Sequence, residues 1–254
     1  MTKRPGEYLV KLLIAFCVCI TCTSVFAEAA RVAVASNFSA PMKKIVDLFE
    51  QQEGHSISLI FGSSGKLFAQ IMNGAPFDIL LSADSSKPQK LEQAGKIVKG
   101  SRFTYATGSL VLWSREKEVI HDSANILKST QFNKLALANP RLAPYGVAAK
   151  QTLQHLGLWT ELKPKIVTGE SISQTYQFVY SGNSELGFVA QSQVFSGGKL
   201  LHGSGWAVPP ELHDPIEQQA VLLVNAKNNQ AALDLITFLK SDKALKIMQS
   251  YGYR

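Results

Sequence analysis

Four short turns in this chain combine hydroxyl side chains and glycine with an almost complete lack of charge. They are Ala35-Ser36-Asn37, Phe61-Gly62-Ser63-Ser64-Gly65, Ala143-Pro144-Tyr145-Gly146 and Gly169-Glu170-Ser171-Ile172. A segment with helical periodicity follows each turn. The first amides of a helix have no partner within it, and the helix dipole makes this end positive, so a helix start favours anions. Four converging helix starts would hold a small oxyanion without a buried Lys or Arg.

Each turn also has an ordinary structural interpretation. Ser36 and Asn37 are residue types that commonly cap a helix, and the stretch from Gly62 to Gly65 is compatible with a tight turn followed by a cap. Two glycines, however, let the backbone approach a ligand closely. Tyr145 either packs as an aromatic ring or donates a hydrogen bond from its amide or hydroxyl. The four turns therefore point to a site as a set rather than one by one.

The segments around these turns alternate between strand and helix patterns, which is typical of a mostly parallel sheet with helices on both faces. Pro41 suits the first residue of a helix, and Gly54 suits a helix end. The expected strands are residues 31–35, 56–61, 77–82, 103–114, 134–138, 165–167, 186–190 and 220–224. The expected helices are residues 41–53, 66–72, 88–93, 146–156, 172–179, 230–240 and 243–249.

This alternation predicts an α/β protein of two lobes. Residues 28–108 and 219–254 would form lobe 1, and residues 109–218 would form lobe 2. The β-type runs near 103–114 and 219–224 would carry the chain across between the lobes, and the last helices would return to lobe 1. In such folds ligands bind at the carboxyl ends of the strands, where all four turns lie. We therefore expect a ligand cleft between the lobes.

The first 27 residues have the pattern of a secretory signal peptide. Its parts are a positive flank (Lys3, Arg4 and Lys11), an apolar stretch (residues 12–20) and a small-residue end (Val25-Phe26-Ala27). The alternative is a membrane anchor, but the run from residue 12 to 27 has about 16 residues, whereas a spanning helix needs roughly 20. We therefore expect removal of residues 1–27 and a periplasmic location.

All three cysteines, Cys17, Cys19 and Cys22, lie in this segment, so the chain from Glu28 onward has no thiol for a disulfide or a metal. The residues before them are not the small residue that lipoprotein processing usually needs. From Glu28, 23 Lys and Arg face 18 Asp and Glu, a net charge of +5. This mild excess fits attraction of a small anion, but a solvated basic surface is the simpler explanation.

Several other function classes fit the sequence poorly. Clustered basic residues with interleaved aromatics, which nucleic-acid binding would need, are missing. A secreted serine hydrolase using Ser64 is an alternative, but Gly-Ser-Ser-Gly is not the Gly-x-Ser-x-Gly of a nucleophile elbow. The five histidines show no metal-binding spacing. An organic-acid binder would place an Arg in the cleft, and only Arg102 and Arg141 lie near the turns.

The chain from Arg31 to Tyr253 resembles the periplasmic molybdate-binding proteins of bacterial ABC importers. The matching motifs are Ala35-Ser36-Asn37, Gly62-Ser63-Ser64-Gly65, Gly74-Ala75-Pro76-Phe77-Asp78, Ser82-Ala83-Asp84, Pro144-Tyr145-Gly146 and Leu186-Gly187-Phe188-Val189. The resemblance implies a two-lobe type II periplasmic binding protein fold, a molybdate or tungstate ligand and a membrane permease as partner. It implies no catalysis, no cofactor and no direct metal coordination, because the metal is bound through its oxygens. We expect a monomer.

The resemblance also implies the ligand contacts, which are Ser36, Asn37, Ser64, Tyr145 and Ile172. Ser64 would use its hydroxyl and its amide, whereas Tyr145 and Ile172 would contribute mainly their backbone N–H groups. Some members of the family use a Tyr hydroxyl at the position that is Ala190 here. Asn37 would then supply the missing donor. A binding protein for another oxyanion, such as sulfate, remains the alternative.

Overall fold

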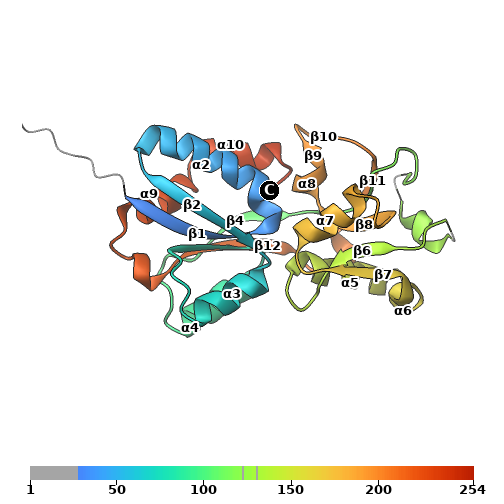
Figure 1. The fold of residues 1–254 in the computed structure, drawn as a ribbon, viewed down its shortest axis with the longest axis horizontal. Coiled ribbons are helices and arrows are strands. Elements are labelled where there is room, and N and C mark those ends of the chain that lie inside the picture. The colour runs from blue at the N-terminus through green and yellow to red at the C-terminus, as the bar shows by residue number, and fades with distance from the viewer. Residues whose placement is uncertain (1–27, 122, 130) are drawn as a thin grey trace, which may run out of the picture.

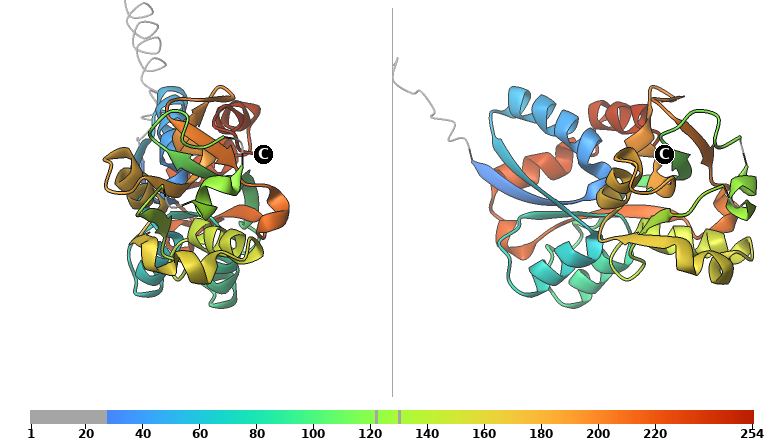
Figure 2. Two further views of the ribbon diagram at one scale, coloured as in Figure 1. Left: turned by 90° about the vertical axis from the view of Figure 1, so that its right-hand side faces the viewer. Right: turned by 45° about the vertical axis from the view of Figure 1, so that its right-hand side comes forward.

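The computed structural model describes residues 28–121, 123–129 and 131–254, so the expected signal peptide lies outside the described residues. Two lobes lie side by side along the long axis of the molecule, each built around a five-stranded sheet (Figures 1 and 2). Helices cover both faces of each sheet, which confirms the expected α/β class. Within the described part of the chain, no helix has the length and apolar character that crossing a membrane requires.

The sheet of the first lobe has the strand order β2-β1-β3-β12-β4. Strands β2, β1 and β3 run parallel, and β12 is antiparallel to both of its neighbours. The strands are β1 (Ala29–Ala35), β2 (Ser56–Gly62), β3 (Ile79–Ser82), β4 (Phe103–Gly108) and β12 (Ile216–Leu222). The helices of this lobe are α2 (Ser39–Glu53), α3 (Ser64–Met72), α4 (Ser86–Gln93), α9 (Gln230–Phe238) and α10 (Asp242–Ser250).

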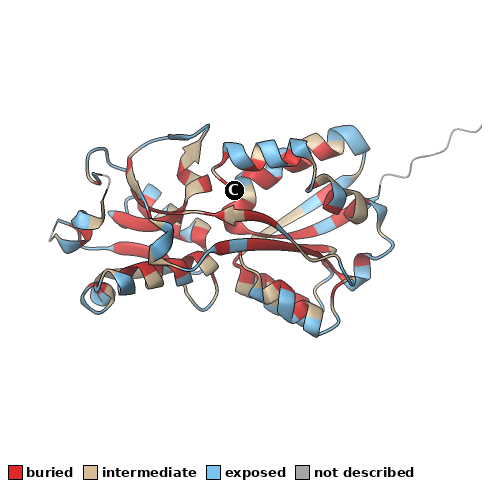
Figure 3. Cartoon of the chain, turned by 180° about the vertical axis from the view of Figure 1, so that it is seen from behind, coloured by how far each residue is buried: buried red, intermediate tan, exposed pale blue. Residues whose placement is uncertain are grey.

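Strand β1 has apolar side chains on both faces of the sheet, so helices must cover both sides of this lobe's sheet. Val32 and Val34 pack in the core beneath α2, α9 and α10, whereas Ala33 packs on the opposite face with α3 and α4. Successive side chains of a strand point to opposite faces, so a strand covered on both faces is apolar throughout. Figure 3 shows that most residues of the central strands are buried, while the helices have one buried and one exposed side.

Helix α2 begins two residues before the expected position. A 3-10 turn, η1 (Ser36–Phe38), follows β1 directly, and Pro41 is the third residue of α2. Proline is tolerated there because the first amides of a helix have no partner within it. The expected end is confirmed, since Gly54 has a φ of 71°, the left-handed conformation that favours glycine.

The second lobe has the strand order β11-β5-β8-β6-β7. Its strands are β5 (Leu110–Ser114), β6 (Leu135–Ala138), β7 (Ile166–Gly169), β8 (Leu186–Ala190) and β11 (Ser204–Ala207). Its helices are α5 (Pro144–His155), α6 (Trp159–Leu162), α7 (Ile172–Tyr180) and α8 (Gln191–Val194). Helices α5 and α6 pack on one face of the sheet, and α7 and α8 border the core of the other.

The chain crosses between the lobes twice. The single β-type run expected over 103–114 is two strands, because Ser109 separates β4 in the first sheet from β5 in the second. The return passes from β11 to β12, which begins at Ile216, before the expected strand at 220 and before the expected lobe boundary at 219. The sequence pattern does not indicate this start, because Gln218 and Gln219 are polar although both are buried.

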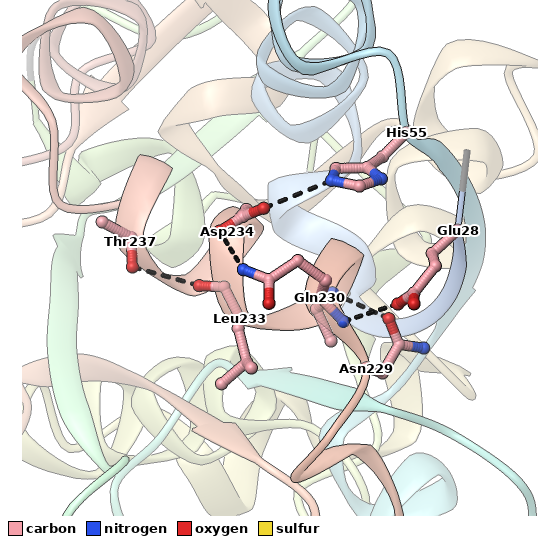
Figure 4. Close-up of polar contacts among 8 residues, drawn as sticks. Glu28, His55, Asn229, Gln230, Leu233, Asp234 and Thr237 are labelled. Atoms are coloured by element: carbon pink, nitrogen blue, oxygen red, sulfur yellow. Dashed lines mark hydrogen bonds and ion pairs between the residues drawn. The ribbon is translucent and has the colours of Figure 1, made fainter. Parts of the chain in front are cut away.

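Helix α9 returns to the first lobe and is tied down by polar contacts at its start (Figure 4). The side chain of Asn229 caps its first turn, and the Glu28 carboxylate accepts a hydrogen bond from the Gln230 amide at 2.6 Å. Further along, the Asp234 carboxylate lies 3.2 Å from the imidazole of His55. These contacts hold α9 against the start of β1 and the short loop between α2 and β2.

Candidate oxyanion-binding site

All four turns that the sequence singles out meet at one small pocket between the lobes. The pocket is small, with about 180 Å³ of empty space that includes open solvent at its mouth. Its lining residues are Ala35, Ser36, Asn37, Gly62, Ser63, Ser64, Ala83, Ala143, Pro144, Tyr145 and Ile172. The five expected contact residues are therefore brought together, two of them from the second lobe and three from the first.

Three serine hydroxyls line the first-lobe side of this pocket. The Oγ atoms of Ser36 and Ser63 are buried and have no hydrogen-bond partner among the described residues. The Oγ of Ser64 accepts a hydrogen bond from the Ala83 amide at 2.9 Å, which leaves its own proton available. A buried polar group without a partner is costly, and its presence at a pocket points to a ligand that supplies the partner.

Helix starts supply the remaining donors. Ser64 and Ile172 are the first residues of α3 and α7, and Tyr145 is the second residue of α5 after Pro144. Amides at these positions point out of the helix, toward the end where the dipole is positive. Helix α5 lies so close to β6 that a Cβ at Gly146 would be 2.1 Å from the Ala138 carbonyl oxygen, so this position requires glycine.

The pocket is neutral. None of the described residues that line it is charged. The nearest ion pair across the cleft joins Lys66 of α3 to Glu170 before α7, and both side chains are about half exposed or more. Within the described residues, no cluster of three His, Asp or Glu side chains is placed to hold a metal ion. The chemistry offered here is therefore hydrogen-bond donation to an anion.

The side chain of Asn37 is bonded within the protein. Its Nδ2 donates to the Gln218 Oε1 at 2.8 Å and to the Tyr253 hydroxyl at 2.9 Å. Both amide hydrogens are thus used within the protein, so Asn37 faces the pocket with its backbone. The position of Asn37 in the turn η1, directly after a strand, leaves its N–H as the group that an anion would use.

The Tyr145 hydroxyl is also bonded within the protein. It accepts a hydrogen bond from the Gln218 Nε2 at 3.3 Å and lies where a Cβ on Gly108 would be 2.1 Å from it. Burial, with Tyr253 and Tyr105 close by, raises the pKa of this phenol well above its ordinary value of 10. The Tyr145 ring and hydroxyl are thus buried and occupied by contacts within the protein.

Direct hydrogen bonds join the two lobes around the pocket. They are Gly65 N–H to the Leu142 carbonyl (2.8 Å), Ser173 Oγ to the Ser36 carbonyl (3.2 Å) and Ser192 Oγ to the Asn37 carbonyl (2.7 Å). Every predicted contact residue is at most 5% exposed. The structure is therefore a closed arrangement in which the site is screened from solvent.

Sequence reasoning did not identify all residues of the site. Ser63 was noted only as part of its turn, although its unpartnered hydroxyl lines the pocket. Ala83 follows β3 and contributes its amide to Ser64, and its motif Ser82-Ala83-Asp84 gave the only signal. Gln218 carried no recognisable pattern. Its burial depends on the packing of distant segments, which one sequence does not reveal.

Comparison with known proteins agrees with this description. The family model described as "Bacterial extracellular solute-binding protein" matches residues 30–254. The molybdate-binding protein ModA of Azotobacter vinelandii is 50% identical over 234 residues, covering 92% of each chain. The ModA of Rhodobacter capsulatus is 48% identical over 221 residues, covering 87% of this chain and 86% of its own.

A solved structure gives the same result. The periplasmic molybdate-binding protein of Azotobacter vinelandii superposes with a TM-score of 0.86 and 37% identity, over 89% of this chain and 98% of that one. This confirms the expected two-lobe binding-protein fold. These relatives are binding proteins, so the hydrolase alternative has no support, and the Ser64 hydroxyl contacts the Ala83 amide rather than a histidine. The chain belongs to the bacterial extracellular solute-binding proteins.

Proposed function

We propose that this protein captures molybdate or tungstate outside the cytoplasm and delivers it to the membrane permease of an ABC importer. One observation carries the proposal. Neutral donors from four turns converge on a small closed pocket lined by two serines whose buried hydroxyls have no partner among the described residues. The names and identities of the relatives support the choice of ligand.

The proposed contacts are Ser36, Asn37, Ser64, Tyr145 and Ile172. Ser36 and Ser64 would donate from their hydroxyls, and Ser64 also from its amide at the start of α3. Asn37, Tyr145 and Ile172 would donate from their backbone amides. Each hydrogen bond to a charged ligand contributes about 1.5–3 kcal/mol net, so several of them hold a dianion without a counter-charge.

Selectivity would follow from size rather than charge. Molybdate and sulfate are both tetrahedral dianions, but donors spaced for the larger ion leave the oxygens of sulfate with longer, weaker hydrogen bonds. Sulfate binding is the second candidate, because the donors themselves are suited to either ion. Tungstate is nearly the same size as molybdate, so the same donors would accept it.

Isothermal titration calorimetry of the protein from Glu28 onward tests this proposal. Molybdate and tungstate are expected to bind with a 1:1 stoichiometry, and sulfate and phosphate at least about tenfold more weakly. Equal affinities for sulfate and molybdate would show that the donor spacing does not discriminate by size. Absence of heat with all four anions would remove the oxyanion function.

The location and assembly are part of the same proposal. Residues 1–27 would direct export and be removed, lobe 1 would comprise residues 28–108 and 219–254, and lobe 2 residues 109–218. The protein would act in the periplasm as a monomer and present its closed form to the permease. The intact mass of the exported protein is expected to equal that of residues 28–254. Its elution volume in size-exclusion chromatography is expected to be that of a monomer.

A further inference from the structure

Gln218 is the one glutamine on the crossing strand β12 that is completely buried, with no exposed surface. Burying a primary amide is unfavourable unless its donors and acceptor are hydrogen-bonded. An apolar residue at this position of a central strand would pack without that cost. The contacts made by the Gln218 side chain therefore need an explanation beyond stability.

Its contacts reach residues of the proposed site in both lobes. The Oε1 of Gln218 accepts from Asn37 Nδ2 at 2.8 Å and from the Tyr105 hydroxyl at 2.9 Å. Its Nε2 donates to the Tyr145 hydroxyl at 3.3 Å. Asn37 lies in the ligand turn of the first lobe, whereas Tyr145 lies at the start of α5 in the second. One side chain thus connects two proposed ligand contacts that approach the ion from opposite sides.

Asn37 is fixed by further bonds, one of which spans the lobes. Its Nδ2 donates to the Tyr253 hydroxyl, and its carbonyl accepts from the Ser192 hydroxyl of α8 at 2.7 Å. The Tyr253 hydroxyl lies 3.0 Å from that of Ser192. The Asn37 peptide is therefore oriented by groups from β12, from α8 and from the segment after α10.

The location of Gln218 is where the lobes are connected. Strand β12 pairs with β4 from Ile216 opposite Gly108, and the register shifts between Gln218 and Gln219. A Cβ on Gly108 would lie 2.1 Å from the Tyr145 hydroxyl oxygen and 2.6 Å from Gln218 Nε2. The absence of a side chain at Gly108 thus makes room for the bond between Gln218 and Tyr145 at the crossing.

We propose that Gln218 is a positioning residue that joins the Asn37 turn to the start of α5 at the crossing between the lobes. Through these two contacts it sets the relative placement of the first-lobe and second-lobe donors in the closed form. This inference rests on the proposed oxyanion function, since it concerns how the same site is assembled. It assigns no contact between Gln218 and the ion itself.

The test compares Gln218→Met with Tyr145→Phe and with the double variant, by calorimetry with molybdate. Methionine has a similar length but lacks the amide, and phenylalanine removes only the hydroxyl that Gln218 contacts while keeping the Tyr145 backbone N–H. Each single variant is expected to raise Kd by about three- to tenfold, the effect of losing one or two buried hydrogen bonds. The double variant is expected to match Gln218→Met alone, because both substitutions break the same connection.

Gln219→Met is the matched control. Gln219 lies next to Gln218 on β12, but its side chain contacts Arg102 and Thr104 within the first lobe. Its Kd is expected to equal that of the wild type. If neither wild type nor Gln219→Met binds molybdate, the proposed function fails, independently of Gln218.

Two results would overturn the inference while the proposed function stands. One is an unchanged Kd for Gln218→Met with a lowered melting temperature, as a purely structural role predicts. The other is additive effects of the two single substitutions in the double variant. If Gln218→Met does not fold, Tyr145→Phe alone tests the inference. Wild-type affinity of Tyr145→Phe would then show that the contact between Gln218 and Tyr145 does not set the placement of the donors.

Discussion

At the scale of single residues, the serines of the second turn differ in what they do for the protein itself. Ser64 Oγ accepts the Ala83 amide, whereas the hydroxyl of Ser63 has no partner among the described residues. Two adjacent serines thus differ, because only the hydroxyl of Ser64 has a partner among the described residues. Since the Ser64 hydroxyl contacts the Ala83 amide, a substitution of Ser64 is expected to change both the stability of the protein and its affinity for the ion.

Ser64→Ala is expected to weaken molybdate binding by about ten- to a hundredfold, through loss of one charge-assisted hydrogen bond. It should also lower the melting temperature, because the buried Ala83 amide loses its acceptor. Calorimetry and a thermal melt of the unliganded protein measure the two effects. Ser241→Ala, which removes the cap of α10, is the control that should lower only the melting temperature. Unchanged affinity in Ser64→Ala would remove this hydroxyl from the site.

At the scale of elements, the start of helix α3 brings the two lobes into contact through backbone atoms. The Gly65 amide donates to the Leu142 carbonyl at 2.8 Å, and a Cβ on Gly65 would lie 2.9 Å from that oxygen. Both partners belong to backbone segments fixed by a helix start and a turn, so neither can move aside easily. Closure of the cleft therefore depends on glycine at this position.

Gly65→Ala is expected to raise the Kd for molybdate by about tenfold or more, because the lobes cannot approach to their closed distance and the bond to Leu142 is lost. Alanine has a higher helix propensity than glycine, so the melting temperature of the unliganded protein should not fall. Calorimetry and thermal melts distinguish the two effects. Lys66→Ala is the control, since it removes only the exposed ion pair with Glu170, which contributes little. Wild-type affinity in Gly65→Ala would mean that closure tolerates the extra methyl group.

The elements also show how far the sequence could be interpreted. Apolar periodicity and local end signals predicted α2, Gly54 and the four turns, because these features depend on neighbours in the chain. The start of β12 was missed, since Gln218 and Gln219 have the composition of an exposed segment and are buried only by distant contacts. The partners of the Asn37 side chain could not be predicted for the same reason, as Gln218 and Tyr253 lie far along the chain.

At the scale of the whole molecule, three buried tyrosines lie where the lobes meet. Burial raises the pKa of Tyr105 and Tyr145 well above 10, and it raises the pKa of Tyr253 to about 12. In the unfolded chain these phenols would ionise near pH 10. The folded state therefore retains protons that the unfolded state has already lost, and the junction between the lobes becomes sensitive to alkaline pH.

The contribution of Tyr253 to the free energy of unfolding is fully present below pH 10 and is lost as the pH rises toward 12. In this range the folded state binds more protons than the unfolded state, so stability falls with increasing pH. Chemical denaturation between pH 8 and 12 should show this decline. Tyr253→Phe is expected to start from lower stability, because Asn37 loses a partner, and to decline less steeply. Tyr180→Phe, which removes an exposed phenol, is the control. Equal slopes in wild type and Tyr253→Phe would contradict the assignment.

The division of the pocket between the lobes has a consequence for unloading. Ser36, Asn37 and Ser64 belong to one lobe, and Tyr145 and Ile172 to the other, so a partner that separates the lobes splits the coordination of the cargo in two. With the proposed contacts, each lobe alone would offer the dianion only part of its hydrogen bonds. Separation of the lobes by the permease would then release the ion at constant pH and without a displacing ion. Such a release suits the proposed periplasmic location, because the composition of the periplasm follows the surroundings of the cell.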